Sequence, residues 1–102
     1  TDLLKRYLER LGYHVDACGD AGTALAWADK TPGRYALVIA DLTLPDMNGA
    51  DLVAKLRRSD PGFRALITSG YPYQSSAEDT EFLQKPFLPK MLAEAIERAL
   101  AR

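Results

Sequence analysis

The alternation of amphipathic helical segments with short apolar segments of strand length constrains the fold of this chain more than any other feature. Residues 35–40 form a continuous apolar run, and residues 63–68 are predicted to form a further strand that stops at Ser69. A run that is apolar at every position is typical of a strand covered on both faces, as in a parallel sheet. Shorter strands are predicted at residues 13–18 and 81–84.

Helical periodicity fills the stretches between these strands. Residues 1–11 predict an amphipathic helix that ends at Gly12, and Asp20 is expected to cap a second helix. A third helix follows the loop 42–49, and a last one begins near Pro89. The positions expected to be buried along the four helices are Leu4, Tyr7, Leu8 and Leu11; Ala21, Ala24, Leu25 and Ala28; Leu52, Val53 and Leu56; and Met91, Leu92, Ala95, Ile96, Ala99 and Leu100. This order predicts an α/β fold, a doubly wound parallel sheet with helices on both faces.

Length and charge exclude several classes of protein. The 102 residues are enough for one domain with one core, and 13 basic against 14 acidic residues leave a formal charge of -1. Direct binding to nucleic acid is not expected from that balance. No apolar run approaches the roughly 20 residues of a membrane span. The single cysteine, Cys18, forms no disulfide within the chain, fits a cytoplasmic location and is expected to be a small buried residue.

Three polar residues each come directly after a predicted strand. They are Asp41, Ser69 and Lys85. In open α/β sheets the functional site lies beyond the carboxyl ends of the strands, so all three are expected at one rim. A carboxylate, a hydroxyl and an ammonium group there could bind and transfer a phosphoryl group, together with Mg²⁺.

Each of these residues also has a plainer interpretation. Asp41 could form an Asx-turn, Ser69 could belong to an ordinary turn, and Lys85 could be a solvated surface lysine. Their joint placement at the ends of three strands favours a functional site.

The chain resembles the receiver domains of response regulators, in the form often attached to hybrid histidine kinases. The resemblance extends over residues 1–102 and is carried mainly by residues 37–49 (LVIADLTLPDMNG), 66–71 (LITSGY) and 82–87 (FLQKPF), with a further match at 7–25. It implies a flavodoxin-like fold and a phosphoacceptor signalling module of a two-component phosphorelay, which is not an enzyme.

The resemblance also assigns roles to individual residues. Asp41 matches the phosphoacceptor, and Thr43 matches the position whose backbone carbonyl, with Asp41, binds Mg²⁺. Ser69 matches the switch hydroxyl, Lys85 the lysine that contacts the phosphoryl group, and Phe82 a switch aromatic. The peptide bond between Lys85 and Pro86 is expected to be cis.

The family further implies partners and a location. A histidine kinase or a phosphotransfer domain would supply the phosphoryl group, in the cytoplasm, without direct contact to nucleic acid or membrane. The sequence fixes neither the cognate kinase, nor the output, nor the oligomeric state, and a dimer is one option.

Two features depart from the family's pattern. Family members begin with a central strand, between those at 13–18 and 35–40, that ends in an acidic pair holding Mg²⁺, and no such strand precedes Thr1. We therefore expect an N-terminally truncated sequence that binds Mg²⁺ weakly. Only about 16 positions separate Ser69 from Lys85, so residues 71–80 are expected to form a short, irregular connection in place of a full fourth helix.

Two other functions compete with phosphoacceptance. A pseudo-receiver would dock on a partner without phosphate chemistry. An aspartate-based phosphohydrolase would need a second carboxylate two residues after the nucleophile, where this chain has Thr43.

Overall fold

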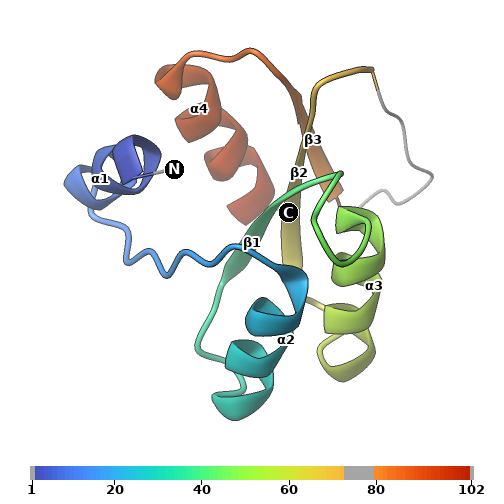
Figure 1. Cartoon of the computed structure of the whole chain (residues 1–102). Helices are drawn as coiled ribbons and strands as arrows, with labels where there is room; N and C mark the ends of the chain where they lie inside the picture. The colour runs from blue at the N-terminus through green and yellow to red at the C-terminus, as the bar shows by residue number, and fades with distance from the viewer. Residues whose placement is uncertain (1, 73–79, 102) are drawn as a thin grey trace.

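A computed structural model describes residues 2–72 and 80–101 of the chain (Figure 1). Helices and strands alternate along most of this length. In order they are α1 (Asp2–Arg10), α2 (Ala21–Lys30), β1 (Leu37–Asp41), α3 (Gly49–Ser59), β2 (Arg64–Ser69), β3 (Thr80–Gln84) and α4 (Pro89–Leu100).

The three strands form one parallel sheet in the order β1-β2-β3. The register pairs Asp41 with Thr68 across β1 and β2, and Ser69 with Gln84 across β2 and β3. The carboxyl ends of all three strands therefore lie at one edge of the sheet. The predicted parallel α/β architecture is confirmed for these elements.

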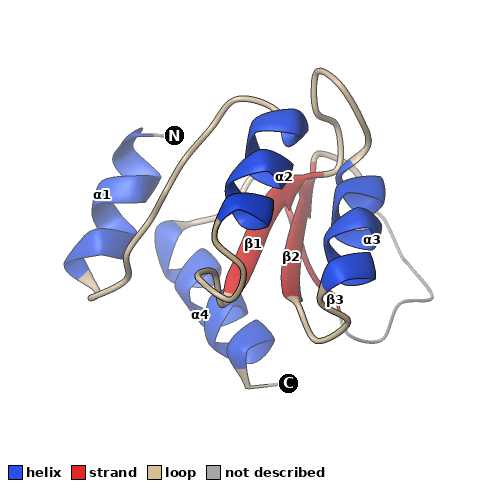
Figure 2. Ribbon diagram, turned by 90° about the horizontal axis from the view of Figure 1, so that it is seen from below, coloured by secondary structure: helices blue, strands red, loops and turns tan. Residues whose placement is uncertain are grey.

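Helices cover both faces of the sheet, as Figure 2 shows. On one face, Leu8 of α1 and Leu92, Ala95 and Ile96 of α4 pack with Leu66 and Leu83. On the opposite face, α2 and α3 pack against β1 and β2 through two clusters of buried residues: Ala21, Ala40, Leu52 and Leu56, and Leu42, Val53, Ala65 and Ile67. Alternate residues of β2 thus enter different cores, as the pleat of a strand requires.

The helix termini follow the capping rules read from the sequence. The Asp20 side chain accepts a hydrogen bond of 2.7 Å from the Thr23 N–H at the start of α2. Gly12, just past α1, has a φ of 100°, which a residue with a Cβ adopts only with strain. Pro89 opens α4, where its absent N–H leaves no hydrogen bond unmade. The predicted cis bond between Lys85 and Pro86 is present.

The predicted strand at residues 13–18 is wrong. This segment has no strand assignment, because β1 pairs only with β2 among the described residues and no ladder reaches it. One consequence is that Cys18, at the end of the unpaired segment, is exposed and not buried as predicted. Ile39 of β1, a strand expected to be covered on both faces, is also 40% exposed.

Two helix positions predicted to be buried are exposed. Leu11 lies one residue beyond the end of α1 and therefore leaves the apolar stripe that buries Leu8. Met91 flanks the stripe of α4 that Leu92 and Ala95 form, so its side chain reaches the surface.

The expected irregular connection at 71–80 falls largely on residues 73–79, outside the described residues. Within the part of the chain that the structure describes, no helix has the length and apolar character needed to cross a membrane.

Candidate functional site

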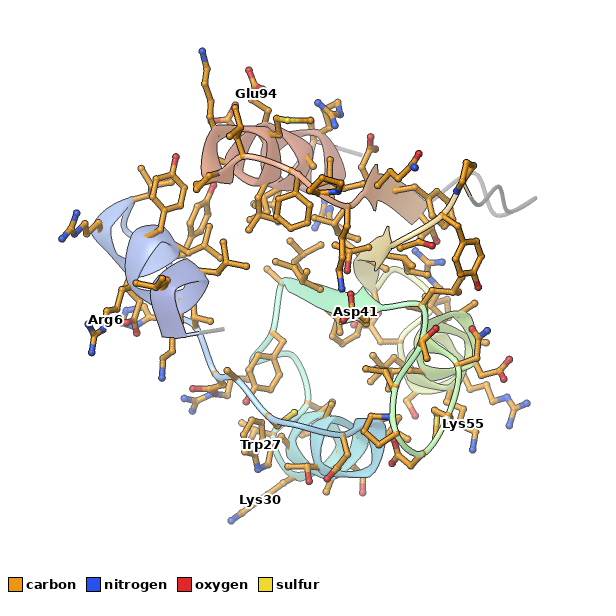
Figure 3. All side chains as sticks on the ribbon, turned by 45° about the horizontal axis from the view of Figure 1, so that its top comes forward. Arg6, Trp27, Lys30, Asp41, Lys55 and Glu94 are labelled. Atoms are coloured by element: carbon orange, nitrogen blue, oxygen red, sulfur yellow. The ribbon has the colours of Figure 1, made fainter. Side chains whose placement is uncertain are left out.

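Asp41 and Lys85 meet at the carboxyl edge of the sheet. The Lys85 Nζ lies 2.6 Å from Asp41 Oδ1, and both side chains are about two-fifths exposed, 44% for the lysine and 42% for the aspartate. Figure 3 shows Asp41 at the centre of the molecule when viewed toward this edge. The other charged residues labelled there extend outward: Arg6, Lys30, Lys55 and Glu94.

Two backbone hydrogen bonds carry the sheet past its last paired residues and position this pair. The N–H of Lys85 donates to the carbonyl of Ser69 at 2.7 Å, and the N–H of Leu42 donates to the carbonyl of Thr68 at 2.8 Å. The residue after β3 and the residue after β1 are therefore both fixed to the end of β2. This explains how two residues 44 positions apart come within hydrogen-bonding distance.

A third side chain at the carboxylate was not anticipated. The hydroxyl of Thr68, a residue only 5% exposed, donates a hydrogen bond to Asp41 Oδ1. Partial burial alone would raise the pKa of Asp41, but the hydrogen bonds from Lys85 and Thr68 and the ammonium charge outweigh it, so that this pKa lies below its ordinary value. Asp41 is consequently ionised at neutral pH.

Ser69 occupies the predicted rim, but its hydroxyl has other partners. It donates to the carbonyl of Tyr71 at 2.7 Å and accepts from the Tyr71 N–H at 3.2 Å. Strand alternation gives the reason, because successive side chains of β2 point to opposite faces. Thr68 shares a face with Asp41 through their register, whereas Ser69 shares the other with Ile67.

Phe82 lies on the Ser69 side of the sheet. It packs with the cluster of Leu42, Val53, Ala65 and Ile67. Together with Ser69 and Tyr71 it lines a pocket of about 260 Å³ at the ends of β2 and β3. The structure thus places Ser69 and Phe82 beside one another, and Asp41 with Lys85.

The loop between β1 and α3 closes tightly over Asp41. Its ends are joined by the Gly49 N–H, which donates to the Leu42 carbonyl at 2.7 Å, and Asn48 caps α3 by accepting from the Ala50 N–H at 2.7 Å. A Cβ on Gly49 would lie 2.2 Å from the Asp41 carbonyl oxygen, so only glycine fits there.

Asp46 ties the same loop to α2. Its two carboxylate oxygens accept hydrogen bonds from the N–H groups of Ala21, at 3.0 Å, and Gly22, at 2.9 Å. These two hydrogen bonds lower the pKa of Asp46. The residue was missed in the sequence because it joins two segments whose proximity only the fold reveals.

Mg²⁺ prefers oxygen ligands in an octahedral arrangement, supplied by one or two carboxylates, phosphate and water. Asp41 offers such a carboxylate, and the Thr43 backbone carbonyl belongs to the exposed loop that follows it. No group of three or more acidic, histidine or cysteine side chains that could hold a metal occurs among the described residues. The oxygen donors of Asp41 and Thr43 are of the type that Mg²⁺ prefers, but they are fewer than its six ligands.

This arrangement offers an ionised, accessible carboxylate beside a fixed cation at the carboxyl edge of a parallel sheet. The ion pair with Lys85 and the hydrogen bond from Thr68 both go to Oδ1 of this carboxylate. Such a group is suited to attack an electrophilic phosphorus atom, because the adjacent ammonium offsets the negative charge of the incoming group.

Nearly the whole chain is similar to known proteins. Residues 1–97 match the model of the response regulator receiver domain. The chain is 34% identical over 104 residues to the DNA-binding transcriptional regulator NtrC of Azospirillum brasilense, which covers 96% of this chain. It spans only about a fifth of that regulator's own length, 21%.

Two solved structures are closely similar. The CheY-like receiver domain protein of Methanospirillum hungatei has a TM-score of 0.81 at 31% identity, covering 98% of this chain and 83% of its own. The receiver domain of the hybrid histidine kinase CckA has a TM-score of 0.85 at 30% identity, covering 97% and 87%.

Proposed function

Because the chain belongs to the family of response regulator receiver domains, which are phosphoacceptor signalling modules, we propose that Asp41 is the residue that takes the phosphoryl group. The single observation that carries the assignment is the Lys85 ammonium, 2.6 Å from the accessible Asp41 carboxylate at the carboxyl edge of the sheet. The donor is a histidine kinase or a phosphotransfer protein, with which receiver domains interact.

In the proposed transfer, Oδ2 of Asp41 attacks the phosphorus of a phosphohistidine. The new P–O bond forms as the P–N bond breaks, and the electron pair of that bond returns to the imidazole nitrogen. Lys85 offsets negative charge on the phosphoryl oxygens, which is the larger part of catalysis in such a transfer. In this scheme the domain accepts a phosphoryl group and does not turn over a substrate, so we do not propose that it is an enzyme.

We propose that Ser69 and Phe82 transmit the change. The hydroxyl of Ser69 would leave the Tyr71 backbone for a phosphoryl oxygen, and Phe82 would turn into the space that Ser69 vacates. Their common pocket at the ends of β2 and β3 supports this coupling. A phosphoryl group can shift the equilibrium only if it interacts differently with the two arrangements.

Mg²⁺ would be held by Asp41 and by the backbone carbonyl of Thr43, and when bound it would neutralise part of the phosphoryl charge. The family's first strand, with its acidic pair, is not among the described residues, and we propose that it belongs along the free edge of β1. The support is that, within the described part of the chain, β1 pairs with β2 alone, and that Ile39 is 40% exposed.

We also propose a cytoplasmic location, with which a single unpaired cysteine is compatible.

The test is phosphorylation by a small acyl phosphate in the presence of Mg²⁺. Label should appear on the chain and should be released by hydroxylamine, which cleaves acyl phosphates but not phosphoserine. Asp41→Asn should abolish it, whereas Asp29→Asn, at an exposed position of α2, should leave it unchanged. Label that persists in Asp41→Asn would refute the assignment.

A pseudo-receiver that docks without phosphate chemistry is the second candidate. It is favoured by the lack of a metal-binding cluster among the described side chains. An NMR titration with Mg²⁺ distinguishes the phosphoacceptor from the docking module. The backbone amide signals of residues 41–43 should shift in a phosphoacceptor and should not shift in a docking module.

A further inference from the structure

Thr68 lies on β2 beside Asp41, and its hydroxyl points at the Asp41 carboxylate. Thr68 is the register partner of Asp41, and its carbonyl accepts the Leu42 N–H at 2.8 Å, so its backbone is fixed beside the carboxylate. The residue is 5% exposed, and the three preceding residues of β2 are buried and apolar. A hydroxyl at this place has Asp41 Oδ1 as its partner.

The two oxygens of Asp41 are therefore unequal. Oδ1 receives both the Thr68 hydroxyl and the Lys85 ammonium, while Oδ2 accepts nothing from the described residues. An ionised carboxylate can only accept, so the single proton of Thr68 must be donated to Oδ1. The hydrogen bond thus has a fixed direction. It keeps Oδ1 hydrogen-bonded, so Oδ2 is the oxygen available to attack phosphorus.

We propose that Thr68 is a positioning residue that keeps Oδ2 as the attacking oxygen and shortens the lifetime of the aspartyl phosphate. The inference rests on the proposed function of Asp41. It assigns a role to a residue that the strand-end pattern did not single out.

The effect on lifetime follows from the charge on Oδ1. In the aspartyl phosphate, Oδ1 is a neutral carbonyl oxygen, whereas in the free carboxylate it shares a negative charge. Hydrogen bonds to charged acceptors are roughly twice as strong as those to neutral ones. Thr68 therefore stabilises the carboxylate, the leaving group of hydrolysis, more than it stabilises the phosphorylated form.

The hydrolysis concerned is balanced without a further reactant. Water attacks phosphorus, its oxygen forms the new P–O bond, and the bond between phosphorus and Oδ2 breaks with its electron pair on the carboxylate. The doubly charged aspartyl phosphate and water give the Asp41 carboxylate and dihydrogen phosphate, each with one negative charge.

The experiment compares Thr68→Val, which removes the hydroxyl and retains the shape, with Thr68→Ser, which retains the hydroxyl. Thr80→Val is the matched control, because Thr80 is also buried in this sheet, at the amino end of β3. After labelling and removal of the donor, Thr68→Val should lose its phosphoryl group about fivefold more slowly than the parent chain. Thr68→Ser and Thr80→Val should decay at close to the parental rate.

A second measurement does not require phosphorylation. Infrared difference spectra between the parent chain and Asp41→Asn isolate the two carboxylate stretching bands of Asp41. Unequal hydrogen bonding of the two oxygens widens the splitting of these bands, so Thr68→Val should narrow it and Thr68→Ser should restore it.

The outcomes separate this inference from the proposed function. If the parent chain is labelled at Asp41 and Thr68→Val changes neither the decay nor the splitting, or shortens the lifetime, Thr68 has only a structural role. If label persists in Asp41→Asn, the function itself fails. If no label is taken up, the band splitting still decides whether Thr68 polarises Oδ1.

Discussion

Replacing Gly49 with alanine tests the packing of the loop over Asp41. Gly49 is the first residue of α3, and within helices alanine is the better helix former by at most about 1 kcal/mol. Helix propensity alone therefore predicts that Gly49→Ala stabilises the protein.

The contacts of the added methyl group predict the opposite. An ideal Cβ would lie 2.2 Å from the Asp41 carbonyl oxygen, 2.9 Å from its carbonyl carbon and 3.2 Å from the Leu42 Cα. All three are backbone atoms, which cannot rotate away. The loop must open, and the hydrogen bond from the Gly49 N–H to the Leu42 carbonyl weakens. Overpacking of about 1–3 kcal/mol and a lost hydrogen bond of about 1 kcal/mol exceed the propensity gain, for a net loss of about 2 kcal/mol.

Urea unfolding monitored by circular dichroism measures this difference. The midpoint should fall while the slope stays constant, because the surface exposed on unfolding is unchanged. The control is Gly19→Ala, where an added Cβ meets no atom within 4 Å; its stability should change by no more than about 0.5 kcal/mol. A Gly49→Ala chain as stable as Gly19→Ala would show that the close approach to Asp41 is not a constraint.

Three further changes test the core, the loop anchor and the site. Leu66→Ala, in the fully buried centre of β2, should lower the free energy of unfolding by roughly 2–5 kcal/mol, whereas Leu3→Ala, 80% exposed, should change it by less than about 0.5 kcal/mol in the same titration. Asp46→Asn should lower the melting temperature at pH 7; because the fold lowers the pKa of Asp46 from 3.8, its contribution is present above that pH and is lost as the pH falls through the lowered pKa, so the difference between the parent and the variant should shrink on acidification below pH 3.8. Lys85→Met should raise the pKa of the Asp41 carboxyl, measured by carbon-detected NMR titration, since it removes the ammonium at 2.6 Å; an unchanged pKa would contradict the ion pair.

The sequence was sufficient for the parts of the fold that local patterns determine. The four helices, the N-cap at Asp20, the proline that opens the last helix and the three strands after residue 35 were all predicted. The strand at 13–18 was not, since pairing depends on a neighbour and not on the segment itself. Alternation in 13–18 indicates an extended backbone, but the described residues provide no adjacent strand to bond with it.

The sequence predicted which residues of the candidate site lie at the ends of strands, but not which of them contact one another. That Asp41 and Lys85 lie together follows from their positions after parallel strands. The partner of the carboxylate among the two neighbouring alcohols did not follow, because it depends on the register of β1 against β2. Asp41 pairs with Thr68, and this one-residue choice decides which hydroxyl shares its face.

The register of β1 against β2 also separates the proposed roles of Thr68 and Ser69, which are neighbours in the sequence. Thr68 contacts the reacting carboxylate on one face of β2, while Ser69 is bound to the Tyr71 backbone on the other. To reach a phosphoryl group, Ser69 must give up both hydrogen bonds to Tyr71, at a cost on the order of 1–3 kcal/mol. In the proposed switch, the contacts of Ser69 with the phosphoryl group have to exceed that cost, so Ser69 is expected to move only when Asp41 is phosphorylated. Thr68 needs no such movement, and its influence on the carboxylate is present before and after transfer. The proposed phosphoryl transfer and the proposed switch therefore use two different hydroxyls at the end of β2, Thr68 and Ser69.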